Sequence, residues 1–230
     1  ASLRPDLARK FTVAIDGPAG AGKSTIAKML AKKLGVLYLD TGAMYRAIGL
    51  KVHESGGDPK KTSDVIPMLD HTDVMIQYEN GYQRVYLDSR DVTDQIRTQQ
   101  ISEAASDVAV IPEVRRKLVS IQRKIASKAS LVMDGRDIGT YVLPDADLKI
   151  FLTASQEERA RRRWEELKDK GIDLEYNTVL QEITSRDHND SSRSISPLKK
   201  AEDAALIDTT NKNIDEVIAE IEGLFQALWG

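Results

Sequence analysis

The chain has 230 residues, of which 41% are hydrophobic and 30% are charged, and its formal net charge is -3. This length suits one α/β domain, and the balance of residue types is that of a globular protein with a sizeable core. The small negative charge argues against a general attraction to nucleic-acid polymers, so anion binding has to come from local clusters of Arg and Lys. The absence of cysteine excludes disulfides, thiolate metal sites and cysteine nucleophiles.

The sequence gives no sign of a zinc site or a membrane span. His53, His71 and His188 are scattered without the spacing of metal ligands. No apolar run approaches the roughly 20 residues that cross a bilayer. Residues 1–10 carry charges but no long apolar stretch, which predicts a flexible leader and not a signal peptide. We therefore expect a cytoplasmic protein.

The first elements alternate between strand and helix. Phe11–Asp16 is a short β-rich run, and Lys23–Leu34 repeats apolar residues at helical spacing before Gly35, a typical helix C-cap. Val36–Asp40 reads as the next strand and Thr41–Glu54 as the next helix. This alternation is typical of a parallel sheet that is covered on both faces.

The same pattern continues towards the C-terminus. Further strands are expected at Leu131–Asp134, Leu148–Leu152 and Ala205–Asp208. Further helices are expected at Glu113–Ser127, Ser155–Lys170, Asn177–His188 and Ile214–Leu228. Five buried strands with crossover helices predict an α/β fold with a doubly wound parallel sheet.

One stretch breaks the alternation. Asp73–Tyr78 and Gln83–Leu87 alternate apolar and polar residues around Asn80-Gly81, a strong signal for a β-hairpin. Residues 88–98 continue this stretch. We interpret it as an antiparallel appendage inserted between units of the parallel sheet.

The glycine loop after the first strand fits the phosphate-binding pattern G-x-x-x-x-G-K-[ST] without deviation, from Gly17 to Ser24. Its glycines let successive backbone N–H groups converge on one anion, and the following helix adds the positive end of its dipole. Lys23 can reach the β- and γ-phosphates, and the Ser24 hydroxyl is placed to bind Mg²⁺. A glycine turn without a ligand would not need this Lys-Ser pair.

This loop predicts a nucleoside triphosphate but no particular reaction, so the arginines outside it matter. A kinase holds two anionic substrates end to end and needs cations more than a nucleophile. The first candidate group follows the second strand, where Thr41 resembles a helix N-cap and Tyr45 and Arg46 lie one turn later. The alternative is a capped helix with a surface arginine.

A second charged group, Asp134-Gly135-Arg136-Asp137, follows the apolar strand at Leu131–Met133. Three charges at the end of a buried strand are costly to desolvate unless they are paired or bind a ligand. A short acidic surface turn is the alternative.

The third group lies in the helix that contains Glu158–Arg163. Arg159 shares one face with both Arg162 and Arg163. Neighbouring glutamates could pair with these arginines on a solvated surface. Alternatively, an arginine-rich helix that ends in a glycine turn suits a lid that closes over ATP.

The segment 186–193 adds Arg186, Asp190 and Arg193 in a run that is too polar for a core position. Several serines make it look flexible, so a plain surface loop is the alternative.

Together these motifs resemble the bacterial cytidylate kinase family in order and spacing. They are AIDGPAGAGKST, LDTGAMYR, EAASDVAV with PEVR, DGRDIGT, ERARRR and RDHND with a following Arg. The likeness runs from about Phe11 to Trp229. The hairpin insertion is similar to the extra segment in the monophosphate-binding region of the bacterial enzymes.

The resemblance implies ATP as phosphoryl donor, with Mg²⁺ as cofactor. The implied ATP-binding residues are Gly17, Pro18, Ala19, Gly20, Ala21, Gly22, Lys23, Ser24 and Thr25. The implied catalytic residues are Lys23, Arg136 and the lid arginines Arg159, Arg162 and Arg163. Ser24 would bind Mg²⁺, although some relatives have Thr or Gly at its position.

CMP or dCMP is the implied acceptor. The matching residues are Arg46, Arg136 and Arg193 for the phosphate, Ser106, Arg115 and Asp137 for the base, Arg186 and Asp190 for the sugar, and Thr41, Tyr45 and Asp134 around them. Thr41 stands where many relatives have Ser.

This assignment has a physical logic at the base. Cytosine offers an amino donor at N4 beside acceptors at N3 and O2, so Asp137 can accept from N4 while Arg115 donates to the acceptors. Uracil reverses the pattern at positions 3 and 4 and leaves buried groups unpaired. Discrimination between CMP and dCMP is expected to be weak unless Arg186 and Asp190 require the 2′-hydroxyl.

We expect a single domain, and without a sustained heptad or an exposed apolar stripe we expect a monomer. Its predicted parts are a core at 11–40, 107–157 and 176–229, a monophosphate-binding region with insertion at 41–106, and a lid at 158–175.

Two alternatives remain open. One is a P-loop kinase for another small acceptor, such as UMP, AMP or shikimate. The other is a nucleotide-binding regulator or GTPase-like switch, which would need a guanine-reading [NT]-K-x-D element that we do not find.

Overall fold

Five parallel strands form the central sheet of the computed structural model, which describes residues 9–229. In spatial order they are β2 (Leu37–Asp40), β6 (Leu131–Gly135), β1 (Thr12–Asp16), β7 (Leu148–Thr153) and β8 (Ala205–Asp208). Every neighbouring pair runs parallel. The chain starts at the central strand and later builds outwards on both sides, so the predicted doubly wound α/β sheet is confirmed.

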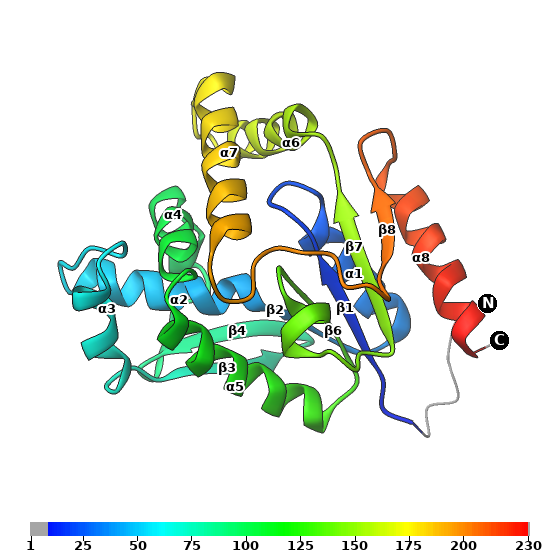
Figure 1. Ribbon diagram of the computed structural model, residues 1–230, viewed down its shortest axis with the longest axis horizontal. Coiled ribbons are helices and arrows are strands. Elements are labelled where there is room, and N and C mark those ends of the chain that lie inside the picture. Colours follow the sequence, from blue (N-terminus) through cyan, green and yellow to red (C-terminus); the bar gives the residue numbers. More distant parts are fainter. Residues whose placement is uncertain (1–8, 230) are drawn as a thin grey trace.

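Helices cover both faces of this sheet (Figure 1). They are α1 (Lys23–Leu34), α2 (Thr41–Glu54), α3 (Thr62–Leu69), α4 (Gln99–Val108), α5 (Pro112–Lys128), α6 (Gln156–Asp169), α7 (Tyr176–Ser192) and α8 (Ile214–Trp229). Alternate residues of β1 point into different cores, because Ala14 packs towards α2 and α5 whereas Val13 and Ile15 pack towards α1 and α8.

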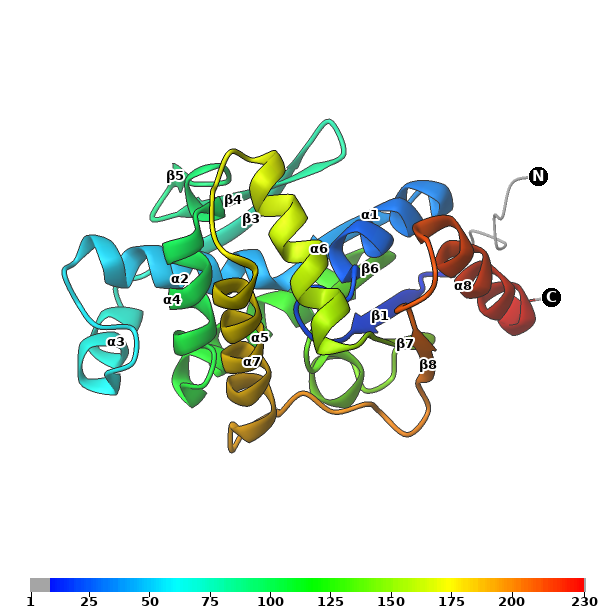
Figure 2. The ribbon, with the colours of Figure 1, turned by 90° about the horizontal axis from the view of Figure 1, so that it is seen from above.

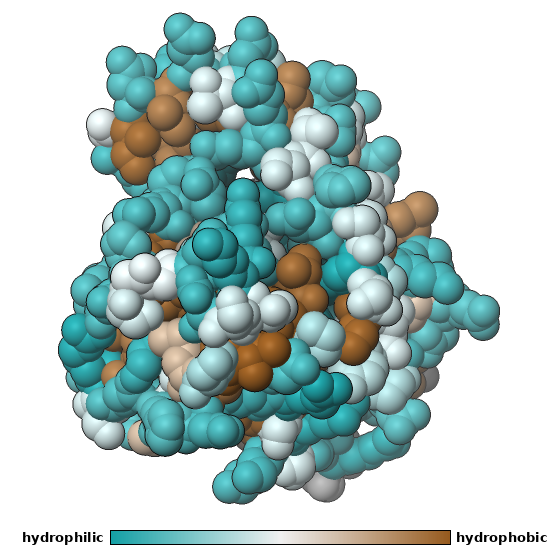
Figure 3. All heavy atoms as spheres, turned by 60° about the vertical axis from the view of Figure 1, so that its left-hand side comes forward, coloured by the Kyte–Doolittle hydropathy of each residue, from teal (hydrophilic) through white to brown (hydrophobic). Residues whose placement is uncertain are grey.

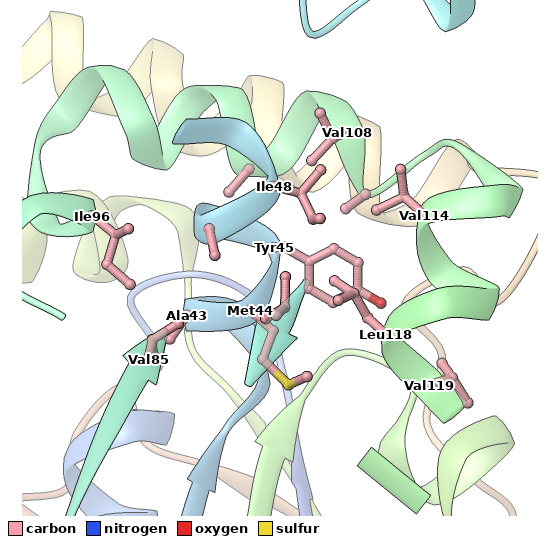
Figure 4. Packing of buried hydrophobic residues seen from close by; sticks show 14 of the residues in the cluster. Ala43, Met44, Tyr45, Ile48, Val85, Ile96, Val108, Val114, Leu118 and Val119 are labelled. Carbon is pink, nitrogen blue, oxygen red and sulfur yellow. The ribbon is translucent and has the colours of Figure 1, made fainter. Parts of the chain in front are cut away.

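The larger core cluster joins α2 to α5 and to the inserted segment. Met44, Tyr45 and Ile48 of α2 face Leu118 of α5 (Figure 4). Val85 of the inserted segment packs against α2 beside Ala43. All are at most 8% exposed. Apolar packing therefore fixes α2 against α5 and the inserted segment.

The predicted hairpin is confirmed. It consists of β3 (Val74–Glu79) and β4 (Tyr82–Leu87), and the short β5 (Arg90–Asp91) adds a third antiparallel strand. Asn80 and Gly81 both have positive φ angles, of 52° and 80°, as a two-residue turn with this twist requires.

Two sequence-based expectations need correction. The helix expected to stop at His188 continues to Ser192, and Asp190 and Arg193 are buried, which argues against the alternative of a plain surface loop at 186–193. Thr41 is not the N-cap of α2: Asp40 is, accepting a hydrogen bond from the Ala43 N–H. The Thr41 hydroxyl instead donates to the Asp134 carbonyl at 2.7 Å.

Helices α3 and α4 were not expected. For α4 the signal was present, because Ile101, Ala105 and Val108 repeat at helical spacing and are buried. Thr98 caps this helix by accepting from the Ile101 N–H at 3.3 Å. None of the helices within residues 9–229 is long and apolar enough to span a membrane. The leader expected at 1–10 lies almost wholly outside the described residues.

Candidate active site

The phosphate-binding loop joins β1 to α1 at the carboxyl edge of the sheet, and its glycines are required by close backbone approaches. A Cβ at Gly17 would lie 2.3 Å from the Leu152 carbonyl oxygen, and one at Gly20 would lie 2.9 Å from that of Arg159. Gly20 and Gly22 also have positive φ angles of 79° and 89°. The loop is thus fitted against β7 and α6, with its N–H groups at the start of α1.

Lys23 is buried under this loop. Burial, followed by the nearby charge of Arg136, lowers the pKa of its ammonium to about 8. The described residues offer this ammonium no direct hydrogen bond or salt bridge, although Asp134, Asp190 and Asp40 lie close enough to favour its charge. A polyphosphate bound on the loop would supply the missing counter-charge.

Ser24 and Asp134 form a pair of oxygen donors beside the loop. The Ser24 hydroxyl donates to Asp134 Oδ2 at 3.1 Å, while Asp134 Oδ1 is buried without a hydrogen-bond partner in the described structure. Burial and then the neighbouring Asp40 raise the pKa of Asp134 to about 7. A hydroxyl and a carboxylate with a free lone pair suit Mg²⁺, which needs few protein ligands when phosphates and water complete its shell.

An open pocket of about 590 Å³ contains Arg136 and Asp190, whose charges act on Lys23. It is lined by all the predicted acceptor residues except Asp134, namely Thr41, Tyr45, Arg46, Ser106, Arg115, Arg136, Asp137, Arg186, Asp190 and Arg193. Elements α2, α4, α5, α7 and the end of β6 contribute them. Hydrophilic residues dominate the face of the molecule in Figure 3, where a narrow gap separates the upper part from the rest.

Two arginines of the pocket have guanidinium groups that lack full pairing. Arg46 Nη1 and Arg193 Nη2 are buried without hydrogen-bond partners among residues 9–229. Burial, followed by the charge of another arginine, lowers the pKa of both Arg186 and Arg193 to about 10. Arg136 donates to Asp190 Oδ2 at 2.8 Å. Such crowding of cations favours an anionic ligand.

The deeper end of the pocket is built on a buried ion pair. Arg115 donates to Asp137, and their side chains are only 3% and 5% exposed. Arg115 also donates to the Ala109 carbonyl at 3.2 Å and lies 5.3 Å from the ring centroid of Tyr45. Its Nε is buried without a partner in the part of the chain that the structure describes. This end can present donors and acceptors to a flat polar ring.

The arginines of α6 differ in their surroundings. Arg159 is 5% exposed and binds both oxygens of Asp187 while also donating to the Ala19 carbonyl of the phosphate loop. Arg162 donates to the Thr209 carbonyl at 2.6 Å. Arg163 donates to the Gln99 side chain of α4 at 2.9 Å.

Glutamates of α6 also pair with its arginines. This pairing was one of the two alternatives that the sequence left open for this helix. Glu158 binds Arg161 and Arg162, and Glu166 binds Arg163. Of these, Arg161 is the most exposed and contacts only glutamates. Arg159 and Arg162 instead contact the phosphate loop, and Arg163 contacts α4.

Comparisons with known proteins decide the family. The model of the cytidylate kinase family matches residues 13–227. The chain belongs to the cytidylate kinase family. The cytidylate kinase of Caldicellulosiruptor saccharolyticus is 55% identical over 222 residues, which are 96% of this chain and 98% of that protein. The cytidylate kinase of Lactobacillus johnsonii is 49% identical, with 93% of each chain covered.

A solved structure supports the fold alone. An uncharacterized protein from Eubacterium ventriosum superposes with a TM-score of 0.51 at 14% identity, covering 95% of this chain and 99% of that one. The two chains therefore share an architecture, and their sequences have diverged widely.

Sequence reasoning missed Asp16. This carboxylate ends β1 and accepts from the N–H groups of Ile138 and Gly139 at 2.9 and 2.8 Å. Burial raises its pKa to about 6, against the effect of these two hydrogen bonds. Asp16 thereby ties the phosphate loop to the segment that carries Arg136 and Asp137. Its position directly before the glycine loop was the available signal.

A second hollow was also missed. It has a volume of about 1400 Å³ and lies beside the phosphate loop, between α6 and the segment from Thr209 to Asn213. Thr25 and Arg162 line it together with that segment. No periodic pattern marks these residues, so only the fold brings them to the loop.

Proposed function

We propose that this protein transfers the γ-phosphoryl group of ATP to CMP or dCMP, giving ADP and CDP or dCDP. The observation that carries the proposal is the arrangement of two anion sites around one buried cation. Lys23 ends the glycine loop Gly17–Ser24, and the charges of Arg136 and Asp190, which line the arginine-rich pocket, act on its ammonium. Membership of the cytidylate kinase family supports both substrates.

The reaction is an in-line displacement. An oxygen of the CMP phosphate attacks the γ-phosphorus of ATP, and the bond from that phosphorus to the β–γ bridging oxygen breaks as ADP leaves. No general base is needed, because the acceptor oxygen is already largely anionic at neutral pH. Lys23 and Arg136, whose charges act on each other, would neutralise the charge that develops between the ATP phosphates and the CMP phosphate.

The lid arginines take a supporting part in this proposal. Arg159, Arg162 and Arg163 belong to α6, which contacts the phosphate loop through the first two residues. Their cationic groups would come to the transferred phosphoryl as α6 closes over ATP and excludes water. The second hollow beside the loop has room for the adenosine part of ATP.

The Ser24 hydroxyl and the Asp134 carboxylate would hold Mg²⁺ together with the ATP phosphates. When bound, Mg²⁺ supplies charge neutralisation and orients the phosphates. Asp134 Oδ1, which has no partner among the described residues, is the available ligand atom. No cluster of three or more carboxylate or imidazole ligands occurs within residues 9–229, so phosphates and water have to complete the shell.

The acceptor pocket is assigned end by end. Arg46, Arg136 and Arg193 bind the CMP phosphate, and that phosphate would release Asp190 from Arg136 so that Asp190 and Arg186 can meet the sugar. At the deeper end, Asp137 accepts from the cytosine amino group, and Arg115 and Ser106 donate to the ring acceptors. Thr41, Tyr45 and Asp134 hold these groups in place.

A coupled assay tests the proposal directly. ADP formation is measured with ATP, Mg²⁺ and CMP, dCMP, UMP, AMP or no acceptor. We expect fast turnover with CMP and dCMP and slow turnover with UMP and AMP. A preference for AMP, or equally fast ADP formation without an acceptor, would reject it.

We also propose that the protein is a monomer in the cytoplasm. Light scattering after gel filtration would check the oligomeric state, and cell fractionation would check the location.

A further inference from the structure

Strand β2 is at one end of the five-stranded sheet, so one of its sides has no neighbouring strand in that sheet. Side chains of the inserted hairpin take the place of that strand. The Asp40 N–H donates to Gln83 Oε1 at 2.9 Å, and Gln83 Nε2 donates to the Asp40 carbonyl at 3.2 Å. The Tyr78 hydroxyl donates to the Tyr38 carbonyl at 3.0 Å.

The two hairpin residues act as a unit because they face each other. Tyr78 of β3 and Gln83 of β4 are direct partners in the antiparallel register, so their side chains lie on the same face. In Figure 1 the hairpin runs alongside α2 towards β2, and in Figure 2 its tip projects towards the side of the molecule on which α1 lies. At its turn, Tyr82 lies under the Lys28 ammonium of α1, 5.4 Å from the ring centroid.

Asp40, whose peptide Gln83 holds, contacts two arginines near the acceptor pocket. Asp40 accepts from the Ala43 N–H and so starts α2, and its Oδ2 lies 3.7 Å from Arg46 Nη1 and 3.3 Å from Arg97 Nη1. Burial alone would raise the pKa of Asp40, but Arg46 and Arg97 outweigh it and lower the pKa. The Asp40 carboxylate thus attracts the Arg46 guanidinium as an ion pair, without a hydrogen bond to its Nη1.

We propose that Gln83 is a positioning residue for the acceptor phosphate. Its side-chain amide fixes the Asp40 peptide with a two-point hydrogen bond, and Asp40 in turn holds the Arg46 guanidinium in the acceptor pocket. The inserted hairpin therefore tunes acceptor binding from outside the pocket, since Gln83 does not line it. This inference rests on the proposed function, in which Arg46 binds the CMP phosphate.

A role limited to covering the sheet edge would give a different result. Covering the edge contributes to stability wherever it occurs, so both Tyr78 and Gln83 would then matter only for unfolding. Asp40 acts on Lys23 and Asp134 through its charge, which Gln83→Met leaves unchanged. No hydrogen bond among residues 9–229 joins Gln83 to the phosphate loop, so loss of the positioning contact should act on the acceptor site. The Michaelis constants for the two substrates separate these cases.

The test compares four variants in the full chain. Gln83→Met keeps the length of the side chain but loses both hydrogen bonds, and Gln83→Glu keeps only the acceptor and adds a negative charge beside Asp40. Tyr78→Phe removes the contact at Tyr38. Gln77→Met is the matched control, since Gln77 is exposed and pairs with Arg84 in the register, on the opposite face of the hairpin from Gln83.

Loss of two hydrogen bonds should raise the KM for CMP about tenfold in Gln83→Met, with the KM for ATP within about twofold of the wild type. Gln83→Glu should raise the KM for CMP at least as much. Tyr78→Phe should lower the melting temperature without changing either KM, and Gln77→Met should change neither property.

An unchanged KM for CMP in folded Gln83→Met, or an equal rise in both Michaelis constants, would overturn the inference. If Gln83→Met did not fold, the shorter amide in Gln83→Asn would serve for the same comparison. Failure of the proposed function is recognised separately, because it would appear as absent CMP phosphorylation in the wild-type protein.

Discussion

In the proposed function, the donor loop and the acceptor pocket bind anions by opposite means. The donor loop is one continuous segment, Gly17–Ser24, in which backbone N–H groups and a helix start do the binding. The acceptor pocket is assembled from side chains of several helices and one strand end. Two of its residues, Tyr45 and Arg193, are more than 100 residues apart in the sequence. A backbone site can be read from a short motif, whereas a side-chain site depends on everything that packs its helices together.

The two regions also differ in how their charges are balanced. Lys23 has no direct partner in the described structure, while the acceptor arginines are partly matched by Asp137 and Asp190. The donor side therefore favours a highly charged anionic ligand that stays charged during the reaction. In our proposal the acceptor side exchanges its internal ion pairs for contacts with CMP, and we expect it to be the more selective of the two.

The largest predicted effect separates chemistry from folding on the donor side. Lys23→Ala should reduce kcat about 1000-fold or more, because the cation between the two phosphates is lost. The melting temperature should not fall, since a buried ammonium without a direct partner is removed. Steady-state kinetics and thermal unfolding measure both. Turnover near that of the wild type would show that Lys23 is not between the substrates.

The next prediction breaks the acceptor pocket at its buried ion pair. Asp137→Asn should lower the preference for CMP over UMP about 100-fold, since the amide can donate to uracil O4. It should also cost about 3 kcal/mol in the free energy of unfolding, because Arg115 is left with an uncompensated charge.

The matched control is Glu113→Gln, which removes an exposed pair with Arg116. A loss of at most about 1 kcal/mol and unchanged selectivity are expected there. Equal effects of the two variants, by urea unfolding and a CMP/UMP competition assay, would contradict the assignment of Asp137.

The pH dependence sharpens the comparison on the donor side. Asp134 has a pKa raised to about 7 and Lys23 a pKa lowered to about 8. Below pH 7 the protonated Asp134 loses its charge as a Mg²⁺ ligand, and above pH 8 Lys23 loses its charge, so kcat/KM should fall on both sides.

Asp134 and Lys23 interact, so the acidic and basic limbs of the kcat/KM profile describe the titration of both groups together. A fall of about tenfold from the maximum is expected one pH unit beyond each limb. Asp134→Asn should remove the acidic limb and lower the maximum. A profile that stays flat from pH 6 to pH 9 would rule out this account of the limbs.

The smallest effect concerns the packing that holds the acceptor helices together. A Cβ at Gly49 of α2 would lie 3.0 Å from the Ala104 Cβ and 3.1 Å from the Ala105 nitrogen of α4. Gly49→Ala should cost about 1–3 kcal/mol in stability and raise the KM for CMP a few-fold.

Gly223→Ala is the control for Gly49→Ala, because a Cβ at Gly223 in α8 would meet nothing within 4 Å. It should stabilise the protein by about 0.5–1 kcal/mol through helix propensity. Thermal unfolding compares the two, and a Gly49→Ala variant as stable as Gly223→Ala would show that α2 and α4 can separate freely.

The contrast between the two regions also explains what sequence alone could predict. The sheet strands, α1, α2 and the hairpin were predicted to within one or two residues, because each has a local period and a turn or cap signal. Asp190 and Arg193 were placed in the pocket only through the family resemblance. By composition their segment looked like a loop, since its burial comes from partners on other elements such as Arg136.

The contacts of Asp16 and the contact of Gln83 with Asp40 could not be predicted, although the position of Asp16 before the glycine loop marked it as a candidate. Each depends on tertiary neighbours, Ile138 and Gly139 in the first case and the edge of β2 in the second. The role of the lid arginines and the boundaries of the lid stay predictions.

The most direct test of the central claim is a calorimetric titration of CMP into the wild-type protein, with Mg²⁺ and with or without an unreactive ATP analogue. We predict measurable binding of CMP in both cases and much weaker binding of UMP. Absence of any heat for CMP on a correctly folded sample would contradict the claim that the arginine-lined pocket beside Lys23 binds the acceptor nucleotide.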